Sequence, residues 1–247
     1  VLVTLGTGIG GGIVANGALV RGHNGFAGEL GHMLVDPSGP RCPCGRRGCW
    51  ERYASGSGLA MLARDAATGH RLHEVVRHAG GDPQAVRGEH VQAAARDGDS
   101  AALQVIDDFS RWVAVGLANL TNALDPEMFV LGGGLAAAPD LYLDPIRQWF
   151  GELLYQPHLR PIPRIEFARF GPLAGAVGAA LLPELADREG SVFLRRFYQK
   201  YRGKTRDEAL AALLDGVRVS PRAVVVALRS VWPGMQASDL APWMARY

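Results

Sequence analysis

The chain has 247 residues, of which 48% are hydrophobic and 20% are charged, and its formal net charge is +2. These values are typical of a soluble globular protein made of one large domain, or of a domain with an appendage. The small net charge gives no support for a nucleic-acid or membrane-surface partner, and no apolar run reaches the length of a membrane span.

The N-terminal segment Val1–Leu5 is apolar and rich in β-branched residues, which predicts a buried strand. The sequence begins with Val1 rather than Met and opens inside this strand, so we expect a fragment of a longer protein. It has no secretory signal, which favours a cytoplasmic protein.

A glycine-rich stretch, Gly6–Gly12, follows directly and leads into Ile13–Ala15, so we expect a strand, a turn and a second strand. Glycines let backbone amides approach an anion closely, and Thr7 adds a hydroxyl donor, so a phosphate group is the expected ligand. A hairpin that binds nothing is the alternative. The spacing matches neither a Walker A motif nor a dinucleotide fingerprint. Asn16-Gly17 then predicts a tight hairpin turn.

All three cysteines of the chain lie within Cys42–Cys49, and one histidine precedes them. Three cysteines and a histidine are a common ligand set of structural zinc, and Gly45 and Gly48 would let the backbone fold back sharply. Full disulfide pairing fails because the cysteine count is odd. Three unpaired buried cysteines beside an unrelated histidine are the alternative. We predict a closed, structural zinc site whose ligands are His32, Cys42, Cys44 and Cys49.

Two carboxylates, Glu29 and Glu51, frame this stretch. They could be ordinary solvated surface groups. With a metal site between them, we favour the interpretation that they line a polar ligand pocket. Zinc thiolates are also suited to a reducing compartment, which agrees with a cytoplasmic location.

Several further helices and strands are expected downstream. A capped helix should follow Ser55–Gly58, and Gly88–Gly98 should form another. Ser100–Leu124 predicts a long helix with one apolar stripe that packs on a sheet. This stripe runs from Leu103 to Leu124 and includes Ile106, Phe109, Val113, Leu117 and Leu120.

A second glycine turn, Gly132–Gly134, follows the predicted strand Met128–Leu131. It is another place where a nucleotide could approach the backbone, although a plain turn is an equal alternative. A helix at Asp140–Leu154, a strand at Arg164–Ala168 and a helix at Leu173–Leu182 complete the pattern. Strands that alternate with helices indicate an α/β architecture.

The C-terminal part has a different character. Residues 184–190 are expected to be a linker, and residues 191–247 contain ten Lys and Arg against four Asp and Glu. A capping box at Thr205–Glu208 indicates a helix there. We expect a small basic helical extension of unknown role. A solvated face or a foreign extension explains its basic residues better than a contact with nucleic acid.

Three motifs together resemble the ROK family of sugar kinases and repressors, and within it the bacterial glucokinases of the actinobacterial type. They are Leu5–Gly12, Gly28–His32 and Cys42–Glu51. The resemblance covers residues 1–183. It implies an α/β, actin-like ATPase (RNase H-like) fold, present mainly as the C-terminal large domain. A zinc-binding loop and an extra helical C-terminal tail would complete the chain.

The resemblance also implies an activity, the phosphorylation of glucose to glucose 6-phosphate by ATP with Mg²⁺. It implies no membrane partner and a homodimer or homotetramer. Glucose rather than another hexose rests on the resemblance alone, and polyphosphate stays open as a phosphoryl donor. A sugar-responsive transcriptional repressor is the alternative.

The resemblance assigns roles to individual residues. Glu29, His32 and Glu51 would bind sugar hydroxyls, with His32 holding zinc through its other ring nitrogen. ATP would contact the two glycine turns, at Gly6, Thr7, Gly8, Gly132, Gly133 and Gly134. The catalytic base of the family is an Asp upstream of the first turn, so no catalytic residue is expected within this chain. We therefore expect the isolated 247 residues to bind metal without turnover.

Overall fold

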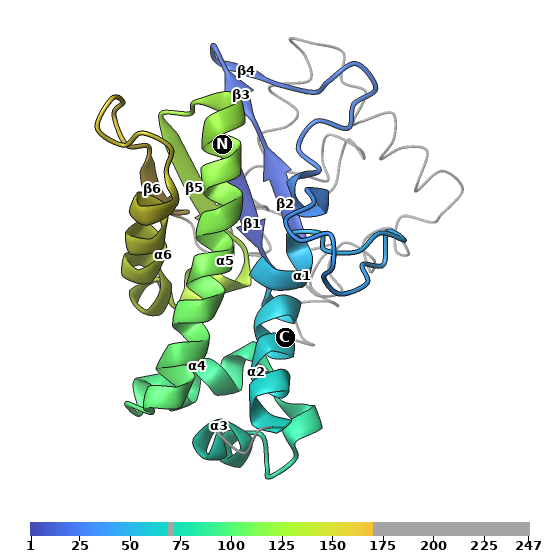
Figure 1. Cartoon of the computed structure of the whole chain (residues 1–247), viewed down its shortest axis with the longest axis vertical. Helices are drawn as coiled ribbons and strands as arrows, with labels where there is room; N and C mark the ends of the chain where they lie inside the picture. The colour runs from blue at the N-terminus through green and yellow to red at the C-terminus, as the bar shows by residue number, and fades with distance from the viewer. Residues whose placement is uncertain (69–71, 170–247) are drawn as a thin grey trace, which may run out of the picture. The chain divides into compact units, whose positions relative to one another are not determined.

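The computed structural model describes residues 1–68 and 72–169, which form a mixed sheet with helices packed against it (Figure 1). The four strands of the main sheet lie in the order β2-β1-β5-β6. They are β1 (Leu2–Leu5), β2 (Ile9–Gly12), β5 (Met128–Gly132) and β6 (Arg164–Phe167). β1 pairs antiparallel with β2 and parallel with β5, and β5 pairs parallel with β6. The expected α/β class is thus confirmed.

The remaining described elements are short strands, α-helices and single 3-10 turns. They are β3 (Val14–Ala15), β4 (Ala18–Leu19), η1 (Leu30–His32), α1 (Glu51–Ala54), α2 (Gly56–Thr68), α3 (His73–His78), η2 (Pro83–Ala85), α4 (Gly88–Arg96), α5 (Ser100–Leu124), η3 (Gly134–Ala137) and α6 (Pro139–Leu153). The expected helix at Leu173–Leu182, the linker at 184–190 and the extension at 191–247 lie outside the described residues. Within the described residues, no helix is both long enough and apolar enough to cross a bilayer.

The glycine-rich stretch after β1 differs from the expectation. The turn is confined to Gly6–Gly8, and Ile9–Gly12 already form β2, with Leu5 opposite Ile9 and Leu2 opposite Gly12. A glycine is needed inside this strand because a Cβ atom at Gly11 would lie 2.5 Å from the side chain of Leu30. The second strand was therefore predicted too late in the sequence, because glycines that allow close packing resemble glycines that make a turn.

The hairpin between β3 and β4 is confirmed. Val14 pairs with Leu19 and Ala15 with Ala18, so two residues connect the strands. Both connecting residues, Asn16 and Gly17, have positive φ angles of 52° and 77°. This is the conformation that a tight hairpin turn requires and that Asn-Gly favours.

Helix α5 lies across the sheet with α6 beside it (Figure 1). The middle of its predicted stripe is buried, and Phe109 of α5 meets Tyr142 of α6 edge to face at 5.7 Å. The ends of the stripe were predicted wrongly, because Leu103 is 44% exposed and Leu124 is 41% exposed. Leu124 is the last residue of the helix. At the other end the helix is covered, because Ala102, Val105 and Ile106 are buried, and Leu103 lies beside this buried face.

An aromatic cluster attaches the cysteine-containing loop to α5. The Trp50 side chain is fully buried, and its indole Nε1 donates a 2.8 Å hydrogen bond to the carbonyl of Trp112. Tyr53 stacks on the Trp112 ring at 4.0 Å and donates a 2.7 Å hydrogen bond to Asp36. The indole of Trp50 occupies the space beside Gly116, where any Cβ atom would collide with the ring.

We predict that Gly116→Ala destabilises the protein by about 1–3 kcal/mol, because the added methyl group forces Trp50 out of its packed position. Urea unfolding followed by circular dichroism measures this change. Gly151→Ala on α6 is the matched control, since nothing lies within 4 Å of a Cβ atom there. That variant should gain stability, because alanine favours the helix by up to about 1 kcal/mol. Equal stabilities of the two variants would contradict the proposed role of the Trp50 contact.

Candidate functional site

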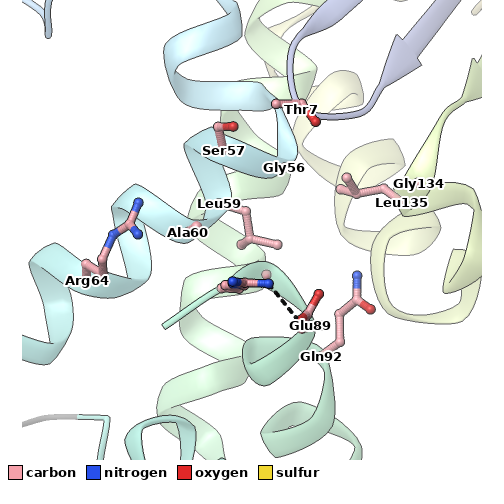
Figure 2. A pocket seen from close by; sticks show the side chains of 12 residues that line it. Thr7, Gly56, Ser57, Leu59, Ala60, Arg64, Glu89, Gln92, Gly134 and Leu135 are labelled. Carbon is pink, nitrogen blue, oxygen red and sulfur yellow. Dashed lines mark ion pairs between the residues drawn. The ribbon is translucent and has the colours of Figure 1, made fainter. Parts of the chain in front are cut away.

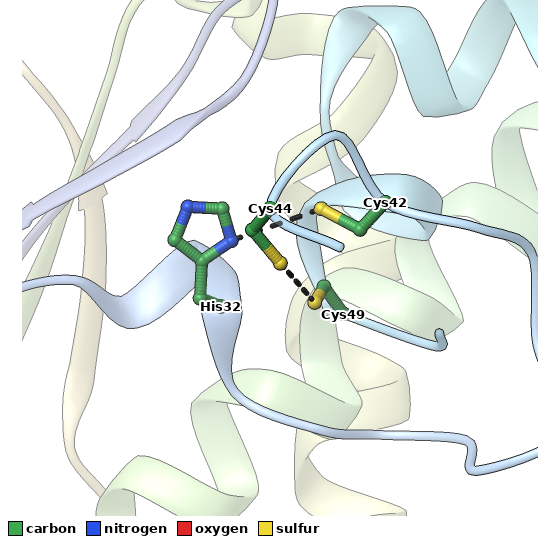
Figure 3. A group of neighbouring side chains, drawn as sticks. All are labelled: His32, Cys42, Cys44 and Cys49. Atoms are coloured by element: carbon green, nitrogen blue, oxygen red, sulfur yellow. Dashed lines mark hydrogen bonds between the residues drawn. The ribbon is translucent and has the colours of Figure 1, made fainter. Parts of the chain in front are cut away.

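The four predicted metal ligands come together in the structure (Figure 3). One ligand atom from each of His32, Cys42, Cys44 and Cys49 lies within 4.8 Å of the others. Cys42 Sγ is 3.8 Å from His32 Nδ1, and Cys44 Sγ is 3.5 Å from Cys49 Sγ. The Nδ1 atom of His32 faces the sulfurs, and Nε2 points away from them.

The local backbone explains how the loop gathers these side chains. His32 ends η1, and Cys49 directly follows Gly48, whose φ angle is 68°. A Cβ atom at Gly48 would overlap the carbonyl of Asp36, and the carbonyl of Gly48 accepts a 2.9 Å hydrogen bond from Val35. The two arms of the loop are thereby held side by side, and Gly45, with a φ angle of 93°, lies in the connecting turn. The expected role of both glycines in folding the loop back is confirmed.

The donor set fits a tetrahedral zinc ion. With Zn–S bonds of about 2.3 Å, two sulfurs of a tetrahedral site lie about 3.8 Å apart, close to the spacing of the ligand atoms here. Burial raises the pKa of the Cys49 thiol to about 12 and also raises that of Cys42, whereas a backbone hydrogen bond at Arg46 lowers that of Cys44. A metal ion must therefore displace protons from the two buried thiols when it binds.

Two of the three predicted sugar-binding residues meet at one of these sulfurs. Cys42 Sγ lies 3.8 Å from His32 Nδ1 and 3.6 Å from Glu51 Oε1. Glu29 is the exposed residue that precedes η1, and its carbonyl accepts a 3.2 Å hydrogen bond from the His32 amide. The structure therefore places His32 and Glu51 around one atom and Glu29 one helical turn before His32.

The first glycine turn lies next to Glu51. Within the turn, the Gly6 amide donates a 3.0 Å hydrogen bond to the carbonyl of Gly8. The amide of Ile9, which begins β2, donates a 3.1 Å hydrogen bond to Oε2 of Glu51. At the other end, the Gly6 carbonyl accepts a 2.7 Å hydrogen bond from the amide of Gly56, the first residue of α2.

Both predicted nucleotide turns contribute to one cavity of about 460 Å³ (Figure 2). Thr7 of the first turn and Gly134 of the second line it, together with Gly56 and Ser57 at the start of α2. Of the other predicted nucleotide contacts, Gly133 lies next to this wall with a φ angle of 87°, and a Cβ atom there would approach the Leu5 carbonyl to 2.6 Å. Gly6 and Gly8 flank Thr7 in sequence, and Gly132 lies two residues before Gly134.

Sequence reasoning missed the opposite wall of this cavity, which includes Arg64 of α2 and Arg87, Glu89 and Gln92 at the start of α4. Arg64 donates to the carbonyl of Val86 at 3.4 Å, and Arg87 pairs with Glu89 at 3.8 Å. Gln92 donates a 3.0 Å hydrogen bond to the hydroxyl of Tyr142. Burial raises the pKa of Tyr142 to about 12, so this hydroxyl stays neutral at physiological pH.

The comparisons with known proteins agree with this geometry. A model of the ROK family matches residues 1–185. The glucokinase of Streptomyces coelicolor is 41% identical over 189 residues, which are 76% of this chain and 60% of that protein. The chain therefore spans about three-fifths of the length of this curated relative.

Solved structures give the same picture. A ROK family glucokinase from Streptomyces griseus, in complex with glucose and AMPPNP, superposes with a TM-score of 0.67 at 40% identity over 70% of this chain and 56% of that one. A ROK family transcriptional regulator, a homologue of the E. coli MLC protein, superposes with a TM-score of 0.52 at 32% identity over 67% of this chain and 40% of that one. The actin-like ATPase fold expected from the sequence is thus confirmed, and the chain belongs to the ROK family.

Proposed function

We propose that the protein phosphorylates glucose with ATP, giving glucose 6-phosphate and ADP. One observation carries this proposal. Thr7 lines the 460 Å³ cavity, and two residues later Ile9 is hydrogen-bonded to Glu51, which contacts the metal-ligand cluster. A nucleotide site and a sugar site on either side of one turn are what phosphoryl transfer between two bound substrates requires.

In this proposal the cavity holds ATP with its Mg²⁺. The backbone amides of the first turn and the Thr7 hydroxyl donate hydrogen bonds to phosphate oxygens. The N-terminus of α2, at Gly56 and Ser57, adds the positive end of a helix dipole. Arg64 provides a permanent positive charge in the cavity wall. Mg²⁺ would neutralise charge on the phosphates during transfer.

Glucose would be held by Glu29, His32 and Glu51. Carboxylates accept charge-assisted hydrogen bonds from neighbouring sugar hydroxyls, and the exposed Glu29 is free to turn towards a ligand. His32 has its Nδ1 atom on the sulfur cluster, which leaves Nε2 for the sugar. The base that accepts the hydroxyl proton is not assigned to a described residue, and the proposed activity is that of the whole protein.

The proposed metal is a structural zinc ion on His32, Cys42, Cys44 and Cys49. When bound, zinc supplies ligand bonds that fix the loop and the ring of His32, and all four ligands come from the protein. With Nδ1 as a ligand, the proton of the neutral imidazole lies on Nε2, so His32 can donate to a sugar oxygen.

A sugar-responsive transcriptional regulator is the second candidate, because a ROK family regulator shares the fold at 32% identity. The cavity lined by both glycine turns favours the kinase, since a regulator need not keep a phosphate site.

We predict that the purified chain binds about one zinc ion and that His32→Gln binds far less. A structural zinc site needs four protein ligands, and this variant removes one of them. Atomic absorption after dialysis measures the ratio. His23→Gln, at an exposed histidine, is the matched control and should keep its zinc. Equal zinc contents in the two variants would show that His32 is not a ligand.

For the whole protein, we predict that Glu29→Ala lowers kcat/KM for glucose roughly 10- to 150-fold, because one hydrogen bond to a charged group contributes about 1.5–3 kcal/mol. A coupled assay for glucose 6-phosphate with ATP and Mg²⁺ measures it. Glu152→Ala, on the exposed side of α6, should match the wild type. If the wild type binds glucose but phosphorylates no hexose, the regulator becomes the better assignment.

A further inference from the structure

We propose that Glu51 is a positioning residue for the nucleotide as well as a sugar contact, because the segment Glu51–Gly56 holds the Gly6–Gly8 turn at both ends. The inference rests on the proposed function, since it concerns how the two substrate sites are joined. In Figure 1, α1 lies at the end of β2 nearest this turn and leads directly into α2.

The first contact is made by the side chain of Glu51. Its Oε2 atom accepts the 3.1 Å hydrogen bond from the Ile9 amide, immediately after the turn. The carboxylate also covers Gly8, since a Cβ atom there would collide with Oε2. A glycine at this position therefore lets the carboxylate lie directly on the backbone of the turn.

The second contact is made by the backbone at the other end of the segment. The Gly56 amide donates its 2.7 Å hydrogen bond to the Gly6 carbonyl, immediately before Thr7. The segment between the two contacts is fixed, because Tyr53, Ala54 and Ser55 are buried. The turn is thus held from both sides by six consecutive residues, and the Thr7 side of the turn faces the cavity.

The same segment begins at the metal-ligand cluster. Cys49 precedes it by two residues, and Oε1 of Glu51 lies 3.6 Å from Cys42 Sγ. A carboxylate has about four acceptor positions on its two oxygens, so Oε1 can hold a sugar hydroxyl while Oε2 keeps the Ile9 amide. The Glu51 side chain therefore both contacts the sugar site and holds the Gly6–Gly8 turn in place.

The test compares Glu51→Ala, Glu51→Gln and the control Glu29→Ala in the whole protein. Hydrogen exchange of a peptide covering Gly6–Gly10 is measured without ligand. Calorimetry then gives the affinity for AMPPNP with Mg²⁺ in the absence of sugar. We expect Glu51→Ala to exchange faster in this peptide alone and to bind AMPPNP about tenfold more weakly, a change of ~1.4 kcal/mol.

The control and the conservative variant separate this role from others. Glu51→Gln should restore both readouts towards the wild type, because its amide oxygen can still accept from Ile9. Glu29→Ala should leave both unchanged, although it removes a proposed sugar contact. If Glu51→Ala does not fold, Glu51→Asp replaces it, since the shorter side chain withdraws the carboxylate from the Ile9 amide and leaves the turn itself unchanged.

Wild-type exchange and AMPPNP affinity in Glu51→Ala would overturn the inference. Faster exchange throughout the chain would overturn it too, because that result indicates a purely structural role. If the wild type does not bind AMPPNP, the proposed nucleotide site is wrong. In that case the exchange of the turn alone decides whether Glu51 holds it.

Discussion

The packing of Trp50 against Gly116 is the constraint on which the rest of the site depends. The loop that carries the three cysteines has little regular secondary structure. It contains isolated β-bridges between Leu34 and Cys49 and between Arg41 and Arg47. It gains a fixed position because the indole is buried on α5 and hydrogen-bonded to the Trp112 carbonyl. Burial of an indole is among the larger hydrophobic contributions that one side chain can make. The next residue is Glu51, so this anchor also sets the start of the segment that reaches the glycine turn.

A structural metal site at this cluster would affect function by fixing the orientation of the side chains around it. The ligand atoms of His32 and the cysteines are gathered within 4.8 Å, and Nδ1 of the histidine is directed towards the sulfurs. Ligation would fix the orientation and tautomer of the ring, as ligand bonds generally do. The proposed sugar contacts would then be rigid on the His32 and Glu51 side and adjustable at the exposed Glu29. The cavity lined by Thr7, which we propose holds the nucleotide, lies on the other side of the same turn, so in this proposal both substrates depend on one piece of backbone.

The cluster of His32 and the three cysteines could be predicted from sequence because its signal is local. Three cysteines within eight residues, with glycines among them, define a turn that can gather sulfurs. The glycine turns were recognisable for the same reason, although β2 begins at Ile9 and not after Gly12. The misplaced strand hid the Ile9–Glu51 hydrogen bond, which joins positions 42 residues apart.

Other parts of the site carry no local pattern. Arg64 lies on α2, Gln92 lies on α4 and Arg87 directly precedes α4, and the packing of α2 against α4 brings them to one cavity. Their residue types at helix surfaces are indistinguishable from solvated side chains in the sequence. Leu103 was misassigned because the buried face at this end of α5 passes through Ala102, Val105 and Ile106, and apolar periodicity alone does not show which neighbouring residue the packing covers.

The decisive measurement is the affinity of the whole protein for AMPPNP with Mg²⁺, with and without saturating glucose. If a sugar site and a nucleotide site share the Gly6–Gly8 turn through Glu51, glucose strengthens AMPPNP binding by about fivefold or more, the lower end of usual coupling between sites. An AMPPNP affinity that is the same with and without glucose would contradict this sharing of the turn.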